Sequence, residues 1–159
     1  MLMRQQQSRE LMPHLMRALA FMQMIEEALR LYVGTAEELI AAAVPYGVPF
    51  RVSRKEINRA ALGKITTMFE KVNRNEDLIK DLRELPEHRN YLAHAAFMQS
   101  VRGIHDESID LEYAKKHAIA VGDRAEKLLT TVGQEMRSLL LNFPNSRAGS
   151  IVSTNPDKV

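Results

Sequence analysis

The chain has 159 residues, of which 45% are hydrophobic and 26% are charged, and it contains no cysteine. The lack of cysteine excludes a disulfide scaffold and any zinc or iron–sulfur site with cysteine ligands, and it suits a reducing cytoplasm. The 22 Lys and Arg side chains exceed the 20 Asp and Glu side chains by only two, so net charge does not indicate a nucleic-acid-binding protein. Length and composition indicate one soluble globular domain.

Low glycine content, nine Met and no Trp favour helices over a sheet. No apolar run reaches the roughly 18 uninterrupted residues that a membrane span requires, because charged side chains interrupt the most hydrophobic stretch, residues 11–33. No compact apolar segment with a small-residue cleavage site follows the N-terminus, which argues against secretion. We therefore expect a cytoplasmic protein without a membrane partner.

The first predicted helix begins at Pro13, after a flexible N-terminus of residues 1–12. Gly34 can end this helix, and Thr35 with Glu38 forms a capping box that can restart it, so one long helix and two helices both remain open. Residues 44–52 include two Pro and one Gly and are expected to form an irregular loop. The apolar stripe of the helix recurs every three or four residues: Leu15, Leu19, Met22, Ile25, Leu29 and Tyr32.

A second capping box, Ser53 with Glu56, opens the next predicted helix, whose inner face extends over residues 57–72. Residues 73–75 then interrupt the helical pattern. A third helical region follows, and Pro86 is expected to bend or restart it, because a proline inside a helix removes one hydrogen bond and clashes one turn back.

The strongest periodicity belongs to the last predicted helix, which Asp110 caps. Such a seam is typical of a long helix in a bundle, so the sequence predicts an all-α, up-and-down four-helix bundle spanning residues 13–143. Residues 144–159 contain turn formers without an apolar face and are expected to form a flexible tail. The seam consists of Ala114, Ala118, Val121, Ala125, Leu128, Val132, Met136, Leu139 and Phe143.

Three polar residues, Arg89, Asn90 and His94, stand in an alanine-rich, otherwise apolar stretch of the third helical region, E-H-R-N-Y-L-A-H-A-A-F. On a regular helix Asn90 and His94 lie one turn apart, whereas Arg89 and His94 diverge by about 140°. A twofold dimer in which two copies of the segment face each other would bring two Arg, two Asn and two His into one cleft. The alternative to such a shared cleft is that the three residues are part of a polar helix surface, or that they form an internal cluster that stabilises helix packing.

Such a set of side chains suits metal-independent cleavage of RNA, in which the ribose 2′-hydroxyl attacks the adjacent phosphate. Histidine titrates near neutral pH, so one copy can accept the hydroxyl proton while the other donates a proton to the leaving oxygen. Arg89 would stabilise charge on the phosphate, and Asn90 would orient the histidine or the nucleotide. No metal or other cofactor is implied, because no carboxylate pair or histidine cluster at ligand spacing accompanies the motif.

The segment R-N-Y-L-A-H resembles the R-x-x-x-x-H signature, with a polar residue after the Arg, of the HEPN (higher eukaryotes and prokaryotes nucleotide-binding) superfamily. The stretch A-L-G-K-I-T-T-M-F, the lead-in L-I-K-D-L-R-E-L and the long last helix also fit that family's helical pattern. The resemblance implies a homodimer with the motifs at its interface and, in many members, metal-independent RNase activity in toxins or defence proteins. It assigns the family roles to Arg89, Asn90 and His94.

One position departs from a large toxin subfamily whose partner is a minimal nucleotidyltransferase antitoxin. That subfamily carries a modified Tyr two residues after the histidine, where this chain has Ala96. The departure argues against that antitoxin pairing and leaves the RNase chemistry in place. Some family members are inactive, so a dimeric binding or regulatory module remains the alternative function. An antitoxin or a regulatory protein is a candidate partner of the chain.

Five basic residues cluster in the stretch R-V-S-R-K-E-I-N-R-A-A-L-G-K and are candidates for contacting an RNA backbone, or form a solvated helix face. Tyr91 and Phe97 flank the motif and either stack on bases or pack. His88 precedes the Arg and is left out of the site, and His117 stands alone and receives no role. The basic residues are Arg51, Arg54, Lys55, Arg59 and Lys64.

Overall fold

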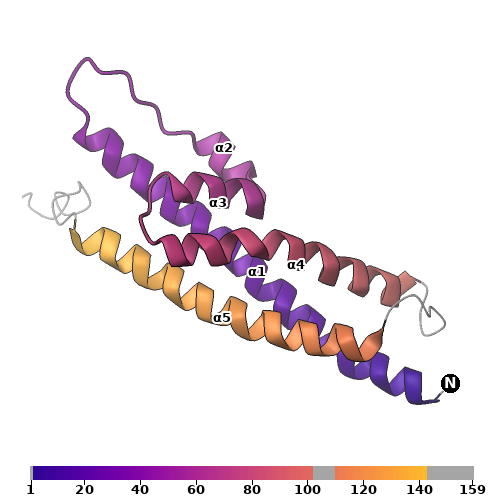
Figure 1. Cartoon of the computed structure of the whole chain (residues 1–159). Coiled ribbons are helices and arrows are strands. Elements are labelled where there is room, and N and C mark those ends of the chain that lie inside the picture. Colours follow the sequence, from indigo (N-terminus) through magenta and orange to yellow (C-terminus); the bar gives the residue numbers. More distant parts are fainter. Residues whose placement is uncertain (1, 102–109, 143–159) are drawn as a thin grey trace, which may run out of the picture.

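The computed structural model in Figure 1 describes residues 2–101 and 110–142. Five α-helices and no strand are present in these residues, which confirms the predicted all-helical class. Phe143 and the predicted tail, residues 144–159, lie outside the described residues. The helices are α1 (Leu2–Ala43), α2 (Arg54–Arg59), α3 (Leu62–Glu70), α4 (Glu76–Val101) and α5 (Leu111–Asn142).

Helix α1 is a single helix of 42 residues, without a break at Gly34. It begins at Leu2, so the predicted helix start at Pro13 was wrong, and residues 2–12, for which a flexible N-terminus was predicted, are part of the helix. Contacts with distant residues hold this first part of the helix in place, since the Ser8 hydroxyl donates a 2.9 Å hydrogen bond to the Gln99 side-chain oxygen on α4 and Leu11 is fully buried. A local sequence pattern does not show such contacts.

The helix predicted after Ser53 is two helices, α2 and α3, separated by extended backbone at Ala60 and Ala61. The carbonyl oxygen of Ala60 accepts hydrogen bonds from Arg30 on α1, at 3.2 Å from Nε and 2.8 Å from Nη2. These bonds replace the backbone hydrogen bond that this carbonyl would accept in a continuous helix. The predicted capping box is also absent, because the Ser53 side chain makes no capping hydrogen bond and its backbone N–H donates to Glu37.

Helix α4 is continuous through Pro86, so the expected restart there does not occur. The predicted break over residues 73–75 is confirmed, and Asn75 caps α4 by accepting a 3.1 Å hydrogen bond from the Leu78 N–H. A side chain on Gly63 of α3 would contact the Pro86 ring, since an ideal Cβ at Gly63 lies 3.7 Å from its Cγ. The proline therefore sits against α3 inside an unbroken helix.

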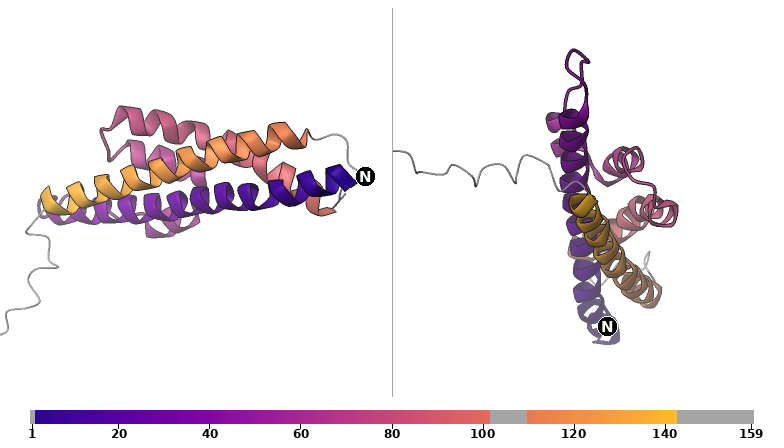
Figure 2. Two further views of the ribbon diagram at one scale, coloured as in Figure 1. Left: turned by 90° about the horizontal axis from the view of Figure 1, so that it is seen from below. Right: turned by 90° about the vertical axis from the view of Figure 1, so that its left-hand side faces the viewer.

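Helices α1 and α5 lie side by side along much of their length and run in the same direction, while α4 runs opposite to both (Figures 1 and 2). In an up-and-down bundle the first and last of four helices are antiparallel, so this part of the fold prediction was wrong. The segment between α1 and α2 carries the chain back along α1, because Ala60 contacts Arg30 and not the end of α1. The ion pairs and ring contacts that define these directions are Glu10–Lys115, Arg17–Asp123, Asp81–Arg124 and His88–His117.

The predicted seam of α5 forms its buried face, and the predicted cap is confirmed, because Asp110 accepts a 3.0 Å hydrogen bond from the Tyr113 N–H. Small side chains on this face allow α5 to approach α1 closely. No helix within residues 2–101 and 110–142 combines the length and the apolar character that crossing a membrane requires. The buried seam residues are Ala114, Ala118, Val121, Ala125, Leu128 and Val132.

Candidate functional site

The three motif residues lie on α4 and point in two directions. The side chain of Arg89 extends toward α1, whereas Asn90 and His94 lie one turn apart on the exposed surface of α4. This separation follows from the helix itself, since residues five apart diverge by about 140° and residues four apart by about 40°. One chain therefore presents Asn90 and His94 together and holds Arg89 to one side of them.

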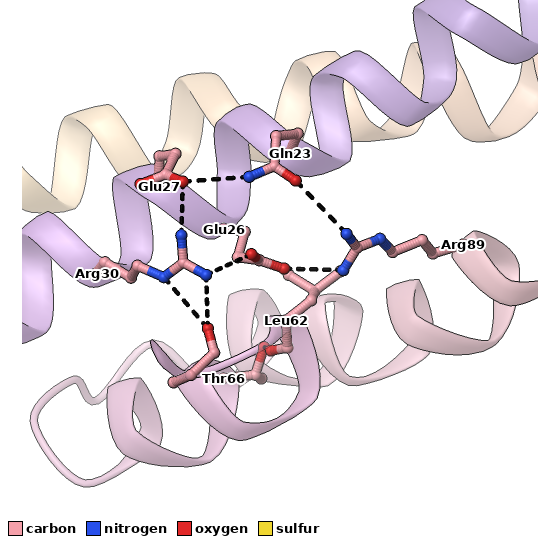
Figure 3. A network of polar contacts seen from close by, with 8 residues as sticks. Gln23, Glu26, Glu27, Arg30, Leu62, Thr66 and Arg89 are labelled. Carbon is pink, nitrogen blue, oxygen red and sulfur yellow. Dashed lines mark hydrogen bonds and ion pairs between the residues drawn. The ribbon is translucent and has the colours of Figure 1, made fainter. Parts of the chain in front are cut away.

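An ion pair with Glu26 of α1 anchors Arg89 (Figure 3). The Nη1 atom of Arg89 lies 2.8 Å from Oε2 of Glu26, and Nη2 lies 3.5 Å from the side-chain oxygen of Gln23. The Glu26 side chain is 6% exposed and the Arg89 side chain is 35% exposed. The guanidinium thus sits at the boundary of the core, with one edge on a buried carboxylate and part of its surface open to water.

The Glu26 carboxylate is shared between two arginines. Its Oε1 atom accepts a 2.5 Å hydrogen bond from Arg30, which also pairs with Glu27 and donates to the Ala60 carbonyl. A carboxylate this deeply buried requires such partners, because desolvating an unpaired charge is very unfavourable. The network therefore links the motif arginine on α4 to α1 and to the break between α2 and α3.

Sequence analysis did not identify Glu26 as part of the site. Glu26 and Arg30 appear in the sequence only as charges that interrupt an apolar stretch. Their separation by four positions is the one local signal, because such a pair faces the same side of a helix. The contact with Arg89, 63 positions away, has no signal in a single sequence.

Asn90 and His94 are exposed, and neither side chain forms a hydrogen bond with any other residue that the structure describes. Both are therefore available to a ligand or to a second copy of the chain. They lie on the outer surface of a helix and not inside a cleft of one protomer, so a second surface is needed to enclose a substrate there.

A cluster of four rings lies beside the motif and was also missed. His88 and Tyr91 on α4 meet Tyr113 and His117 on α5, and Nδ1 of His88 lies 3.3 Å from Nε2 of His117. Burial, and secondly the neighbouring His88, lowers the pKa of His117. Burial also raises the pKa of Tyr91, with smaller contributions from Tyr113 and Asp110. Sequence analysis gave His117 no role because its partner lies 29 positions away.

The five basic residues proposed for RNA contact are all exposed on α2, α3 and the preceding loop. Arg54 pairs with Glu38, and Lys64 lies 2.8 Å from Glu56. Within the described residues no hydrogen bond or ion pair connects Arg51, Arg54, Lys55, Arg59 or Lys64 with the motif. None of these five side chains therefore pairs directly with Arg89, Asn90 or His94 within the described residues.

The candidate site consists of an anchored arginine, an exposed Asn–His pair and an adjoining ring cluster. Comparison of the chain with family models, with curated proteins and with solved structures found no match. The functional interpretation therefore depends on these side chains and their surroundings.

Proposed function

We propose that this chain is a HEPN-like, metal-independent endoribonuclease whose active site forms where two copies of the α4 motif meet in a homodimer. The observation that carries the proposal is the exposed pair of Asn90 and His94 on the same helix as an arginine held in place by a buried carboxylate. Both side chains are exposed on one face of α4, where two opposed copies would enclose a phosphate.

In this proposal two histidines share the proton transfers. His94 of one protomer accepts the proton of the ribose 2′-hydroxyl as the 2′-oxygen attacks phosphorus, and the second copy donates a proton to the 5′-oxygen as its bond to phosphorus breaks. The products are a 2′,3′-cyclic phosphate and a 5′-hydroxyl. Asn90 orients the histidine or the nucleotide without adding charge.

Arg89 would stabilise the charge that develops on the phosphate. A guanidinium has five N–H donors, and contacts with Glu26 and Gln23 engage only part of them. The remaining donors and the exposed part of the side chain are available to a phosphate oxygen. Glu26 limits the conformations of the arginine, so less entropy is lost when the phosphate binds.

The second candidate function is a catalytically inactive dimeric module that binds a protein or a nucleotide. The Arg89–Glu26 ion pair favours it, because a buried carboxylate compensates the charge that catalysis would require. A role as the toxin partner of a nucleotidyltransferase antitoxin stays a prediction that Ala96 disfavours. The two candidate functions differ in a single measurable property, which is cleavage of RNA.

Purified protein and a His94→Ala variant are incubated with mixed RNA in excess chelator. We expect wild type to cut RNA and leave 2′,3′-cyclic phosphate ends, and we expect His94→Ala to lose at least about 100-fold in rate, as is usual for a missing general acid or base. His14→Ala is the matched control, since His14 lies on α1 and is not part of the motif, and we expect it to leave the rate unchanged. Intact RNA with wild type, or equal cutting by His94→Ala, refutes the proposal.

Dimerisation is tested separately by measuring the mass of the protein in solution. The proposal requires twice the mass of one chain under conditions where RNA is cut. An active monomer would contradict the shared site while leaving the RNase chemistry intact.

A further inference from the structure

Four side chains form a continuous group of rings between α4 and α5, which we call the aromatic platform: His88, Tyr91, Tyr113 and His117. Tyr113 stacks on His117, with ring centroids 5.7 Å apart and an angle of 13° between the ring planes. Tyr91 stands edge-on to both, at 5.0 Å and 83° from His117 and at 6.0 Å and 85° from Tyr113. The rings therefore hold one another in defined orientations.

The exposure of the platform distinguishes it from aromatic packing in the core. Tyr113 is 56% exposed and Tyr91 is 36% exposed, whereas the core ring pair Tyr32 and Phe69 is 4% and 0% exposed. His117 covers one side of Tyr113, and much of the rest of Tyr113 faces water. Exposed, pre-oriented rings are a suitable surface for stacking, because little side-chain entropy remains to be lost on binding.

The platform adjoins the proposed catalytic face. Tyr91 is three residues before His94 and one after Asn90, so its ring emerges from α4 about 60° around the helix from His94. The same end of the platform carries Asp110, whose carboxylate accepts a hydrogen bond from the Tyr113 N–H and contributes to raising the pKa of Tyr91. A carboxylate disfavours a phosphate at this position, and an uncharged flat group is the ligand that suits it.

We propose that the aromatic platform binds an unpaired nucleobase by stacking on Tyr113 against Tyr91, next to the phosphate that the motif engages. This inference rests on the proposed function, because it places the base of an RNA substrate beside His94. Every base has a flat face, so the platform binds single-stranded RNA with little sequence preference. Paired bases would be excluded, because their faces are covered by their neighbours in the helix.

Binding is measured with a non-cleavable 2′-O-methyl RNA of about eight nucleotides, a length within the range that one single-strand site covers. The protein has four Tyr and no Trp, so quenching of its tyrosine fluorescence reports stacking directly. We expect Tyr113→Ala to weaken binding about 5- to 100-fold, as removal of one stacking partner typically does, and Tyr113→Phe to bind like wild type. Tyr46→Ala is the control, since Tyr46 is fully exposed in the loop between α1 and α2.

Equal affinity of Tyr113→Ala and wild type overturns the inference, and so does equal affinity for an oligonucleotide whose bases have been removed. Tyr91→Leu is a second variant that removes the other wall of the platform, and circular dichroism checks that both variants fold. Weaker binding by both variants with retention in Tyr113→Phe supports the inference.

The same variants separate this inference from the proposed RNase function. If wild type binds through the platform but never cuts RNA, the platform is retained and the RNase proposal fails. If wild type cuts RNA and Tyr113→Ala has an unchanged KM for RNA, the RNase proposal is retained and the inference that the platform binds a base is refuted. If wild type neither binds nor cuts, both are refuted. His94→Ala should bind RNA like wild type and fail only in cleavage.

Discussion

The Arg89 guanidinium on α4 lies 2.8 Å from the carboxylate of Glu26, which is buried on α1. This ion pair ties the motif helix to the longest helix of the fold. Because the same carboxylate also binds Arg30, and Arg30 donates to the Ala60 carbonyl, one acidic residue connects α1 and α4 to the break between α2 and α3. The position of the motif arginine therefore depends on the integrity of this network.

Replacing Glu26 by Gln should destabilise the protein by about 2–4 kcal/mol, because it leaves the largely buried Arg30 and the partly exposed Arg89 without their shared countercharge. Urea unfolding of wild type and variant measures the difference. Glu27→Gln is the control, since Glu27 pairs with the same Arg30 but its side chain is 60% exposed, and we expect a loss below about 1 kcal/mol. Similar losses for the two variants would show that burial of Glu26 is not the cause.

Local signals in the sequence predicted the parts of the fold that local interactions determine. Asp110 caps α5, residues 73–75 interrupt the helices, and the apolar seam of α5 is buried. Each of these features depends on residues within a few positions of one another, so a periodic pattern or a capping residue is enough to indicate it.

Contacts between distant residues determine the parts that were missed. A hydrogen bond from Ser8 to Gln99 holds the first turns of α1 against α4. A hydrogen bond from Arg30 to the Ala60 carbonyl stabilises the break between α2 and α3. The candidate site divides in the same way. The spacing of the motif predicts that Asn90 and His94 lie together and Arg89 apart, but not that Glu26 binds the arginine.

Gly133→Ala should stabilise the protein by about 0.5–1 kcal/mol, since an alanine is favoured over glycine inside a helix and an added Cβ at Gly133 meets nothing within 4 Å. Gly122→Ala, on the same helix, is the comparison. Its Cβ would lie 2.9 Å from Nη1 of Arg17, which must move away from Asp123, so we expect a smaller gain. Thermal unfolding measures both, and a lower melting temperature for Gly133→Ala would contradict this account of α5.

Asn73→Ala should destabilise the protein by about 2–3 kcal/mol, because it breaks several hydrogen bonds at a buried position. The side-chain amide donates to the Tyr32 hydroxyl and to Glu135, both at 3.0 Å, and its oxygen accepts from the Asn75 N–H at 2.8 Å. Chemical denaturation gives the change. Asn58→Ala, at an exposed position on α2, serves as the control and should change the free energy of unfolding by less than about 0.5 kcal/mol. An equally large loss there would indicate a general sensitivity to asparagine removal.

Acid should weaken the contact between α4 and α5, because burial, and secondly His88, lowers the pKa of His117 in the folded protein. The unfolded chain then binds a proton at a higher pH than the folded chain does. The contribution of neutral His117 to stability is therefore complete above the unfolded pKa, about 6.5, and is lost as the pH falls below it toward the folded value.

The measurement is the free energy of unfolding of wild type and His117→Gln at pH values between about 5 and about 8, a range that spans the titration of unfolded histidine. Many carboxylates also titrate toward the acid end, so the difference between the two proteins isolates His117. We expect wild type to lose more stability than His117→Gln on acidification. Parallel curves for wild type and His117→Gln would mean that the pKa of His117 does not change on folding. The packing of His117 between His88 and Tyr113 would then not favour the neutral form of the imidazole over the protonated form.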